Sequence, residues 1–237
     1  MNEQSTDRSL ESMTERLMAR VKSITPEEKA EHERRLALQE NAHRQWEFQR
    51  LLSDAQVPKR HSEKNIEKVG EWAEKLQTLS NLIAGKNGPL IALVGVRGNG
   101  KTQLAVELIR ETCRAQKAAL FATATEFFME IKSSFKRDSD LDESEILHNY
   151  ERPFLLVIDE IGKRGGTDWE NNLLFELLNR RYNAMKPTVL IDNRSLSDFV
   201  ETIGPSLASR MTEGGGIIEC KWESFRGLDT KCPTVTA

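Results

Sequence analysis

The stretch from Gly95 to Thr102 reads GVRGNGKT, which satisfies the phosphate-loop pattern G-x-x-x-x-G-K-[ST]. Its glycines let the backbone curl so that N–H groups point at phosphate oxygens. In such a loop Lys101 can reach the terminal phosphates and Thr102 can bind Mg²⁺. An apolar run at residues 90–94 precedes the loop, and an amphipathic segment at residues 103–113 follows it. This strand–loop–helix context favours a nucleotide site over a merely glycine-rich turn.

A second motif ends the apolar run FLLVIDE, residues 154–160. Such a run predicts a buried parallel strand, and ligands bind at the carboxyl edge of a parallel sheet. Asp159 is therefore suited to the Mg²⁺ shell, and Glu160 is suited to orient or deprotonate the attacking water. Without a phosphate loop, two acids after a strand would more often cap a helix.

For two further residues, Asn193 and Arg210, the sequence alone leaves more than one role possible. Asn193 follows the apolar run 188–191 and can contact the γ-phosphate or the water, or else it caps the turn before Leu196. Arg210 lies on a short predicted helix before three glycines at 214–216. A lone arginine there is usually a surface charge.

Strands and helices alternate along the chain from residue 90 onward. Apolar runs at 90–94, 119–122, 154–158, 188–191 and 217–219 alternate with helical patterns at 101–115, 125–136, 168–185 and 196–203. This alternation predicts an α/β fold, with a largely parallel sheet flanked by helices.

The first part of the chain is different in character. The protein has 237 residues, 30% of them charged, and its apolar residues gather from Gly88 onward. A helix is expected from the capping residue Thr25 to about Ser53, ended by Val57-Pro58, and a second from Ile66 to Ala84. The first helix has a thin apolar stripe, so it either folds back on the core or serves as a partner-binding arm.

Composition excludes several classes of protein. No apolar run is long enough to span a membrane, and the first residues lack a signal-peptide core. Three widely spaced cysteines match neither a disulfide framework nor a zinc motif, which suggests a cytoplasmic protein. The net charge of −3 argues against a wholly basic nucleic-acid binder but allows a local basic patch.

Three segments carry a resemblance to a known family: Leu155 to Gly162, Ser209-Arg210-Met211, and Ile217 to Arg226. Together they resemble DnaC-type replicative helicase loaders and the wider IstB-like ATPases, which are AAA+ P-loop proteins. The resemblance covers roughly residues 58–227. It implies an AAA+ ATPase domain at 58–237 and a helicase-binding helical region at 1–57. In one departure, no large C-terminal lid is expected, because the 15 residues after Trp222 are too few for the helical lid of larger AAA+ proteins.

The resemblance also implies roles for individual residues. Asp159 and Glu160 would be the Walker B pair, with Asn193 as sensor 1. Arg210 would be an arginine finger for a neighbouring subunit. The nucleotide would be bound by Gly95, Gly98, Asn99, Gly100, Lys101, Thr102 and Gln103. Ser206 stands where many loaders have an arginine, and Arg226 matches a family arginine without an assigned role.

Loaders of this family also bind single-stranded DNA through a cation, a hydroxyl and aromatic side chains. The matching positions here are Lys132, Phe135, Thr167 and Trp169. Their chemistry fits, because cations meet phosphates and aromatic faces stack on bases. Phe135 has an alternative, since it shares a helical face with Phe128 and Ile131 that is expected to point to the core.

The expected function is therefore ATP- and Mg²⁺-dependent loading of a DnaB-type hexameric helicase onto single-stranded DNA at replication initiation. Self-association in the assembled complex and slow hydrolysis by the isolated chain are also expected. The alternative is an IstB-like ATPase that assists a DNA transposase, which shares the same motifs. A small-molecule kinase is disfavoured because Glu160 directly follows Asp159. A further alternative, a nucleotide-gated adaptor that binds ATP but hydrolyses very little of it alone, overlaps with the helicase-loader hypothesis.

Overall fold

The computed structural model describes residues 25–63, 70–85, 87–135 and 142–222. The chain divides into two compact units, Met1–Trp46 and Glu47–Ala237. Arg226 and Cys232, and the expected start of the second helix at Ile66, lie outside the described residues.

Helix α2 (Pro26–Asp54) begins at the predicted capping box. The Glu28 N–H donates to Thr25 Oγ1 at 3.2 Å, and the Thr25 N–H donates to the Glu28 carboxylate at 2.9 Å. In the first unit, Leu36, Leu38 and Trp46 on this helix are exposed. The prediction of a long helix from Thr25 to about Ser53 is therefore confirmed.

The end of α2 belongs to the second unit. Leu51 and Ala55 are buried, and Phe48 packs against the same apolar cluster. Just beyond the helix, the Ala55 carbonyl accepts a hydrogen bond of 2.8 Å from the Phe121 N–H on the outer strand of the sheet. Residues 47–55 are thus part of the packing of the second unit.

Five parallel strands form one sheet in the order β2-β3-β4-β1-β5. The strands are β1 (Leu90–Val94), β2 (Ala119–Thr123), β3 (Leu155–Asp159), β4 (Thr188–Ile191) and β5 (Gly216–Glu219). All five lie within one or two residues of the predicted runs. The strand that leads into the phosphate loop, β1, lies between β4 and β5.

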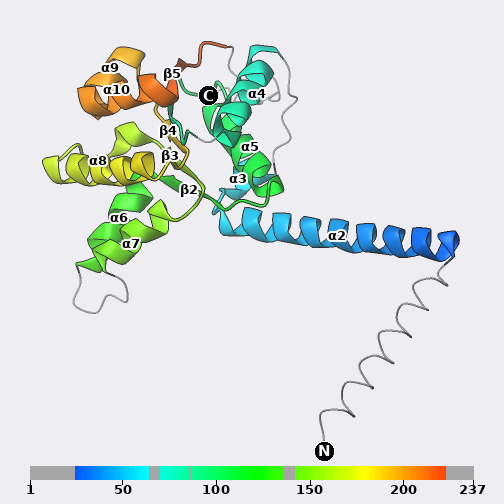
Figure 1. Ribbon diagram of the computed structural model, residues 1–237. Helices are drawn as coiled ribbons and strands as arrows, with labels where there is room; N and C mark the ends of the chain where they lie inside the picture. Colours follow the sequence, from blue (N-terminus) through cyan, green and yellow to red (C-terminus); the bar gives the residue numbers. More distant parts are fainter. Residues whose placement is uncertain (1–24, 64–69, 86, 136–141, 223–237) are drawn as a thin grey trace, which may run out of the picture. The chain divides into compact units, whose positions relative to one another are not determined.

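Helices cover both faces of this sheet (Figure 1). They are α3 (Lys59–Ser62), α4 (Gly70–Ala84), α5 (Lys101–Arg114), α6 (Ala124–Ser134), α7 (Glu143–Glu151), α8 (Asp168–Asn183), α9 (Leu196–Ile203) and α10 (Pro205–Gly214), with a short 3₁₀ turn, η1, at Ile161–Lys163. The helices α6 to α10 cover one face and α4 and α5 the other.

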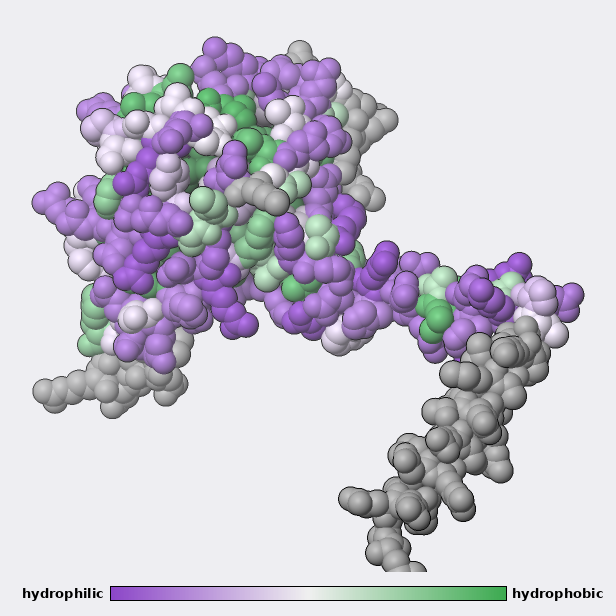
Figure 2. Space-filling model, in the orientation of Figure 1, coloured by the Kyte–Doolittle hydropathy of each residue, from purple (hydrophilic) through white to green (hydrophobic). Residues whose placement is uncertain are grey.

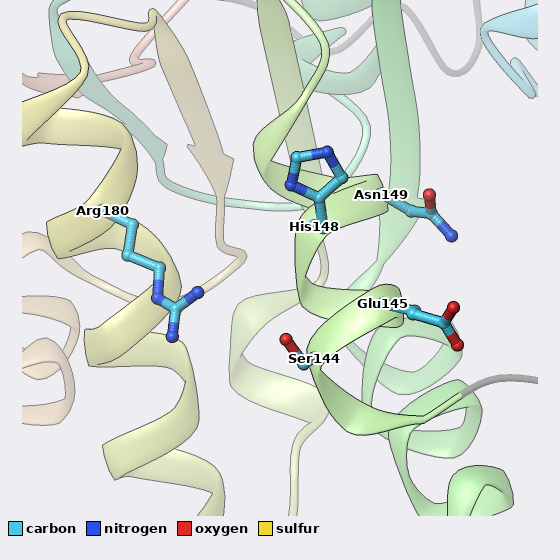
Figure 3. A pocket seen from close by; sticks show the side chains of 5 residues that line it. All are labelled: Ser144, Glu145, His148, Asn149 and Arg180. Atoms are coloured by element: carbon cyan, nitrogen blue, oxygen red, sulfur yellow. The ribbon is translucent and has the colours of Figure 1, made fainter.

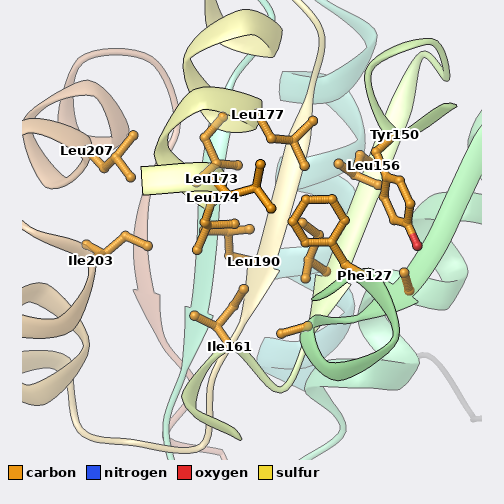
Figure 4. Close-up of a cluster of buried hydrophobic side chains, with 14 of the residues drawn as sticks. Phe127, Tyr150, Leu156, Ile161, Leu173, Leu174, Leu177, Leu190, Ile203 and Leu207 are labelled. Atoms are coloured by element: carbon orange, nitrogen blue, oxygen red, sulfur yellow. The ribbon is translucent and has the colours of Figure 1, made fainter. Parts of the chain in front are cut away.

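Alternate residues of each strand point to opposite faces, because side chains alternate along a strand. Leu156, Ile158 and Leu190 join the cluster under α6 to α10, part of which Figure 4 shows. Val157, Val189 and Ile191 join the cluster under α4 and α5. Both faces are buried, which explains why the strands read as continuous apolar runs.

Two features of the fold were not predicted. Helix α7 begins at a capping box in which Asp142 accepts from the Glu145 N–H at 2.8 Å. Arg181 of α8 is completely buried, although arginine is rarely so. Its guanidinium donates to the carbonyls of Tyr150, Glu151, Pro153, Phe154 and Pro187 and to the Thr188 hydroxyl. This arginine therefore ties α8 to the segments that start β3 and β4.

Candidate functional site

The predicted phosphate loop connects β1 to α5. Its three glycines, Gly95, Gly98 and Gly100, have φ values of 125°, 96° and 80°, which other residues rarely adopt. At Gly95 a Cβ atom would also lie 3.0 Å from the Cys220 carbonyl oxygen. The glycine spacing of the motif is therefore required by the backbone itself.

Lys101 is buried at the start of α5, and its ammonium lies within the curve of the loop. Nζ donates to the carbonyls of Gly95 and Val96, both at 2.7 Å, and to Asn99 Oδ1 at 3.2 Å. The cation thus lies beside the backbone that is expected to cradle phosphates. The helix N-terminus directly behind it adds to the attraction for an anion.

Thr102 and Asp159 meet although they come from different elements. The Thr102 hydroxyl donates to Asp159 Oδ2 at 2.7 Å, which brings the first residues of α5 to the end of β3. Burial raises the pKa of the Asp159 carboxyl, despite hydrogen bonds from Thr102 and the Glu160 N–H. A hydroxyl oxygen and a carboxylate are the hard ligands that suit Mg²⁺, with nucleotide phosphates completing its shell.

Glu160 follows in a left-handed conformation, with φ 59° and ψ 39°. Its N–H donates to Asp159 Oδ1 at 2.6 Å, and its carboxylate pairs with Lys163 Nζ at 2.5 Å. This backbone conformation is uncommon for a residue other than glycine. Glu160 lines the same pocket as the phosphate loop.

This pocket has a volume of about 480 Å³ and gathers three predicted motifs. Its lining consists of Val96, Arg97, Glu160, Gly162, Lys163, Asp192, Asn193 and Arg194. Two residues of the phosphate loop, Glu160 of the acidic pair and the end of β4 therefore share one cavity. Asn193 is one of the residues that line this cavity.

Asn193 is not the N-cap of the following helix, which was the alternative interpretation of this residue. Ser195 is the N-cap of α9 and accepts from the Asp198 N–H at 3.2 Å. Sequence reasoning missed the neighbouring pair, in which buried Asp192 accepts from Arg194 Nη2 at 2.8 Å. The Arg194 carbonyl in turn accepts from the Gly95 N–H at 3.1 Å, so this pair supports the phosphate loop.

The two other predicted nucleotide residues make structural contacts. Asn99 is buried and donates from its side chain to the Cys220 carbonyl. Gln103 interacts with His61 of α3, at 3.3 Å to Nδ1 and 3.3 Å to the carbonyl. Both side chains hold the loop and its helix against neighbouring segments.

Arg210 is not among the residues that line the pocket. Its guanidinium donates to Asn179 of α8 and lies over two rings of that helix, 5.5 Å from the Phe175 centroid and 5.2 Å from that of Tyr182. The structure therefore places Arg210 on the α8–α10 surface.

Three of the four predicted DNA-contacting residues form one cluster. Lys132 Nζ lies 5.4 Å from the centroid of the Trp169 ring, and the rings of Phe135 and Trp169 meet edge to face at 5.9 Å. Phe135 is 60% exposed, whereas Phe128 and Ile131 are buried, so the expected core face does not include it. Thr167 caps α8, with its hydroxyl accepting from the Glu170 N–H at 3.3 Å.

Another pocket, of about 410 Å³, lies between α7 and α8 (Figure 3). Its lining is Ser144, Glu145, His148, Asn149 and Arg180, none of which belongs to a predicted motif. The face drawn in Figure 2 is mostly hydrophilic. None of the described helices combines the length and apolar composition that crossing a membrane requires.

The chain is similar to known proteins over much of its length. The family model described as "IstB-like ATP binding protein" matches residues 3–231. The replicative helicase loader DnaC of Escherichia coli K12 is 28% identical over 137 residues, which cover 57% of this chain and 56% of that protein. DnaC of Buchnera aphidicola subsp. Schizaphis graminum is 26% identical over 133 residues, which cover 56% and 54%. The matches thus span about half the length of these relatives.

Solved structures share the fold. The crystal structure of the DnaC helicase loader superposes with a TM-score of 0.59 at 21% identity, over 68% of this chain and 99% of that chain. AMPPCP-bound DnaA from Aquifex aeolicus superposes with a TM-score of 0.54 at 23% identity, over 64% and 47%. At these identities the likeness concerns the fold alone.

Proposed function

The chain belongs to the family of IstB-like ATP-binding proteins, and from this premise we propose that it loads a replicative DNA helicase onto single-stranded DNA. ATP binding and hydrolysis would switch its hold on both partners. The fold shared with DnaC and DnaA is the AAA+ P-loop fold that the sequence predicted. The similarity to proteins named as helicase loaders supports a helicase as the partner.

The pocket that joins the phosphate loop, Glu160 and Asn193 is the observation that carries the ATPase part of the proposal. Lys101 and the N-terminus of α5 would bind the phosphates, and Thr102 and Asp159 would hold Mg²⁺. Bound Mg²⁺ supplies charge neutralisation at the phosphates. Glu160 would accept a proton from the attacking water, and Asn193 would orient that water.

Arg210 would complete this site in a neighbouring subunit. Its position on α10, against α8 and away from the pocket lining, leaves the positive charge on a surface. A cation supplied by a neighbour would stabilise charge on the transferring phosphoryl group. Hydrolysis by the isolated chain would accordingly be slow.

The Lys132–Phe135–Trp169 cluster supports a single-stranded DNA site. It combines a cation with the exposed ring of Phe135 and the partly buried ring of Trp169, and nonspecific single-strand binders also pair cations with aromatic rings. Lys132 also pairs with buried Glu170 at 3.2 Å, which fixes the lysine beside the ring. A phosphate could contact the exposed ammonium while a base stacks on an aromatic face.

Trp169→Ala tests this DNA site. Affinity for an oligothymidine should fall roughly five- to hundredfold, the range that loss of one stacked base predicts. Met129→Ala, at an exposed apolar residue of the same helix α6, is the control and should bind the oligonucleotide as the parent does. Equal affinities for the parent and the Trp169 variant would remove the cluster from the DNA site.

The N-terminal region would recognise the helicase. Its exposed Leu36 and Leu38 on α2 suit helix-on-helix contact with a partner. We keep the division into a partner-binding region at 1–57 and an ATPase domain at 58–237 as a proposal. Because residues 47–55 pack in the second unit, removal of residues 1–46 is the appropriate truncation.

Co-purification with ATP and Mg²⁺ distinguishes the two candidate partners. The full chain should retain purified replicative helicase and fail to retain an IS21-type transposase, whereas the chain lacking residues 1–46 should retain neither yet still bind ATP. The transposase alternative is favoured by the family model, which is that of IstB-like proteins. Capture of the transposase in place of the helicase would establish that alternative and overturn the loader proposal.

A further inference from the structure

Two tryptophans donate hydrogen bonds to consecutive carbonyls of the phosphate loop. The Trp222 indole N–H, in the segment after β5, donates to the Asn99 carbonyl. The Trp72 indole N–H, on α4, donates at 3.4 Å to the Gly100 carbonyl, which also accepts from the Leu104 N–H of α5 at 2.8 Å. Neither residue belongs to the loop motif, and Trp222 is 123 positions away from Asn99.

Both indoles approach the loop from the same side. Trp72 is buried in the apolar cluster under α4 and α5, and Trp222 packs against that cluster. The carbonyl oxygen of Asn99 therefore points toward this cluster, and that of Gly100 is shared between the Trp72 indole and the first turn of α5.

The direction of a carbonyl fixes the direction of the next N–H. A trans peptide is planar, with its C=O and N–H on opposite sides, and no cis peptide occurs in the described residues. An Asn99 oxygen held toward the cluster therefore turns the Gly100 N–H away from it. The Gly100 oxygen does the same for the Lys101 N–H. These are amides of the kind that bind phosphate in such a loop.

We infer that Trp72 and Trp222 are positioning residues of the nucleotide site, which preorganise two phosphate-binding N–H groups by holding the carbonyls behind them. The inference deepens the proposed ATP site and rests on it. Asn99 strengthens the arrangement, because its side chain is bonded to the Cys220 carbonyl, two residues before Trp222. The segment 220–222 thus contacts the loop through both the backbone and the side chain of Asn99.

The inference is tested by replacing Trp222 with an aromatic residue that has no ring N–H. Trp222→Phe should weaken ATP binding about two- to tenfold, the value of one hydrogen bond. Its melting temperature without nucleotide should stay within a few degrees of the parent, because Trp222 lies at the margin of the cluster. Trp222→His restores a ring N–H and should recover part of the lost affinity.

A spectroscopic measurement on the unaltered chain makes the test independent of folding of the variants. In ¹⁵N spectra the indole N–H signals of Trp72 and Trp222 should exchange slowly with water and shift when ATP–Mg²⁺ binds. The signal of Trp46, which is 59% exposed, should do neither.

The outcomes separate this inference from the proposed function. If the unaltered chain binds no ATP, the proposed function itself fails. If it binds ATP while the Trp72 and Trp222 signals do not move, and Trp222→Phe binds ATP with parental affinity, the positioning role is overturned. A variant that loses stability without nucleotide but keeps its ATP affinity when folded also overturns it.

Discussion

At the scale of single residues, the left-handed backbone of Glu160 separates two acids that are adjacent in sequence. Asp159 ends β3 and accepts from Thr102, whereas Glu160 turns into the pocket beside the phosphate loop. A left-handed conformation costs an ordinary residue roughly 1–2 kcal/mol. Under the proposed function, the two carboxylates would therefore have different tasks, Asp159 in metal binding and Glu160 in proton transfer.

Two substitutions distinguish these tasks from phosphate binding. Lys101→Ala removes the ammonium held within the loop and should weaken ATP binding about tenfold or more, on the order of 1.4 kcal/mol. Glu160→Gln keeps the shape and should leave ATP affinity nearly unchanged while assembled protein hydrolyses ATP roughly a hundredfold more slowly. Isothermal titration and a phosphate-release assay measure the two effects. Equal loss of ATP affinity in both variants would make Glu160 a metal ligand or a structural acid.

The buried cysteines give a prediction about pH. Burial raises the pKa of the Cys113 thiol to about 11 and that of the Cys220 thiol to about 12. The folded state therefore favours the neutral thiols, a contribution to stability that is complete below the ordinary thiol pKa of about 8.5. It is lost as the pH rises through the raised values.

At pH 8, a Cys232→Ser variant should accordingly react with Ellman's reagent only at the rate of unfolding. Both remaining thiols should react at once in denaturant. The Cys232 position lies outside the described residues, so its removal leaves only the two buried thiols to report. Rapid reaction of one thiol in the folded variant would contradict the burial of that side chain.

At the scale of helices and strands, Arg181 is the contact on which the junction of α7, α8, β3 and β4 depends. Its guanidinium satisfies five carbonyls and one hydroxyl, and burial lowers its pKa to about 9. Arg181→Met should lower the free energy of unfolding by roughly 3–5 kcal/mol, because buried acceptors lose their donors.

Arg180→Met is the matched control in urea denaturation. The neighbouring arginine is partly exposed and pairs with Glu176 and Glu151 on the surface. Exposed pairs of this kind contribute little, so a change within about 1 kcal/mol is expected. Similar losses in the two variants would show that the junction does not depend on Arg181.

The sequence predicted those elements whose signals are local. The strands are short apolar runs, so composition was sufficient to locate them. The phosphate loop is one contiguous motif and could be recognised from its own residues. Helix α7 was missed even though Asp142 and Glu145 form a capping box, a signal that the sequence does contain. The contacts of Arg181 and Trp222 join positions far apart in the chain, and no local pattern records which carbonyl a side chain will meet.

The candidate site likewise contains residues that local motifs predicted and residues that depend on contacts distant in the chain. Lys101, Thr102, Asp159 and Glu160 were predicted because their motifs directly follow apolar strands, and the carboxyl ends of parallel strands lie at one edge of the sheet. The support of the loop by Asp192 and Arg194 was missed, because it depends on the Gly95 N–H and the packing of β4 beside β1. For Phe135 the sequence allowed either a core position or a DNA-contacting surface position. Its side chain is exposed because α6 ends at Ser134, so Phe135 does not continue the buried face of that helix.

At the scale of the whole molecule, Arg210 predicts that the active unit contains more than one chain. Its guanidinium rests on α8 and does not line the pocket. Arg210→Ala should therefore bind ATP with nearly the parental affinity, since the phosphate loop of each chain is intact. Its loss should appear as reduced hydrolysis in protein assembled on DNA or helicase.

Mixtures of variants decide between action on a neighbour and action within one chain. Arg210→Ala and Lys101→Ala should each be inactive alone. In a mixed assembly, an intact phosphate loop can meet an intact arginine, so partial ATPase activity should return. The absence of recovery over a range of mixing ratios, in protein shown to co-assemble, would make Arg210 a structural residue or one that acts in its own chain.

The hydrogen bond from the Phe121 N–H to the Ala55 carbonyl has a consequence for aggregation. β2 is an outer strand of the sheet, and unpaired edges invite other chains to add strands. The segment just after α2 occupies part of that edge. A proteolytic cut before Glu47 leaves this cover in place, whereas loss of Ala55 uncovers the edge. The stretch of chain around Ala55 should thus help to keep the second unit from adding strands of its own copies to β2.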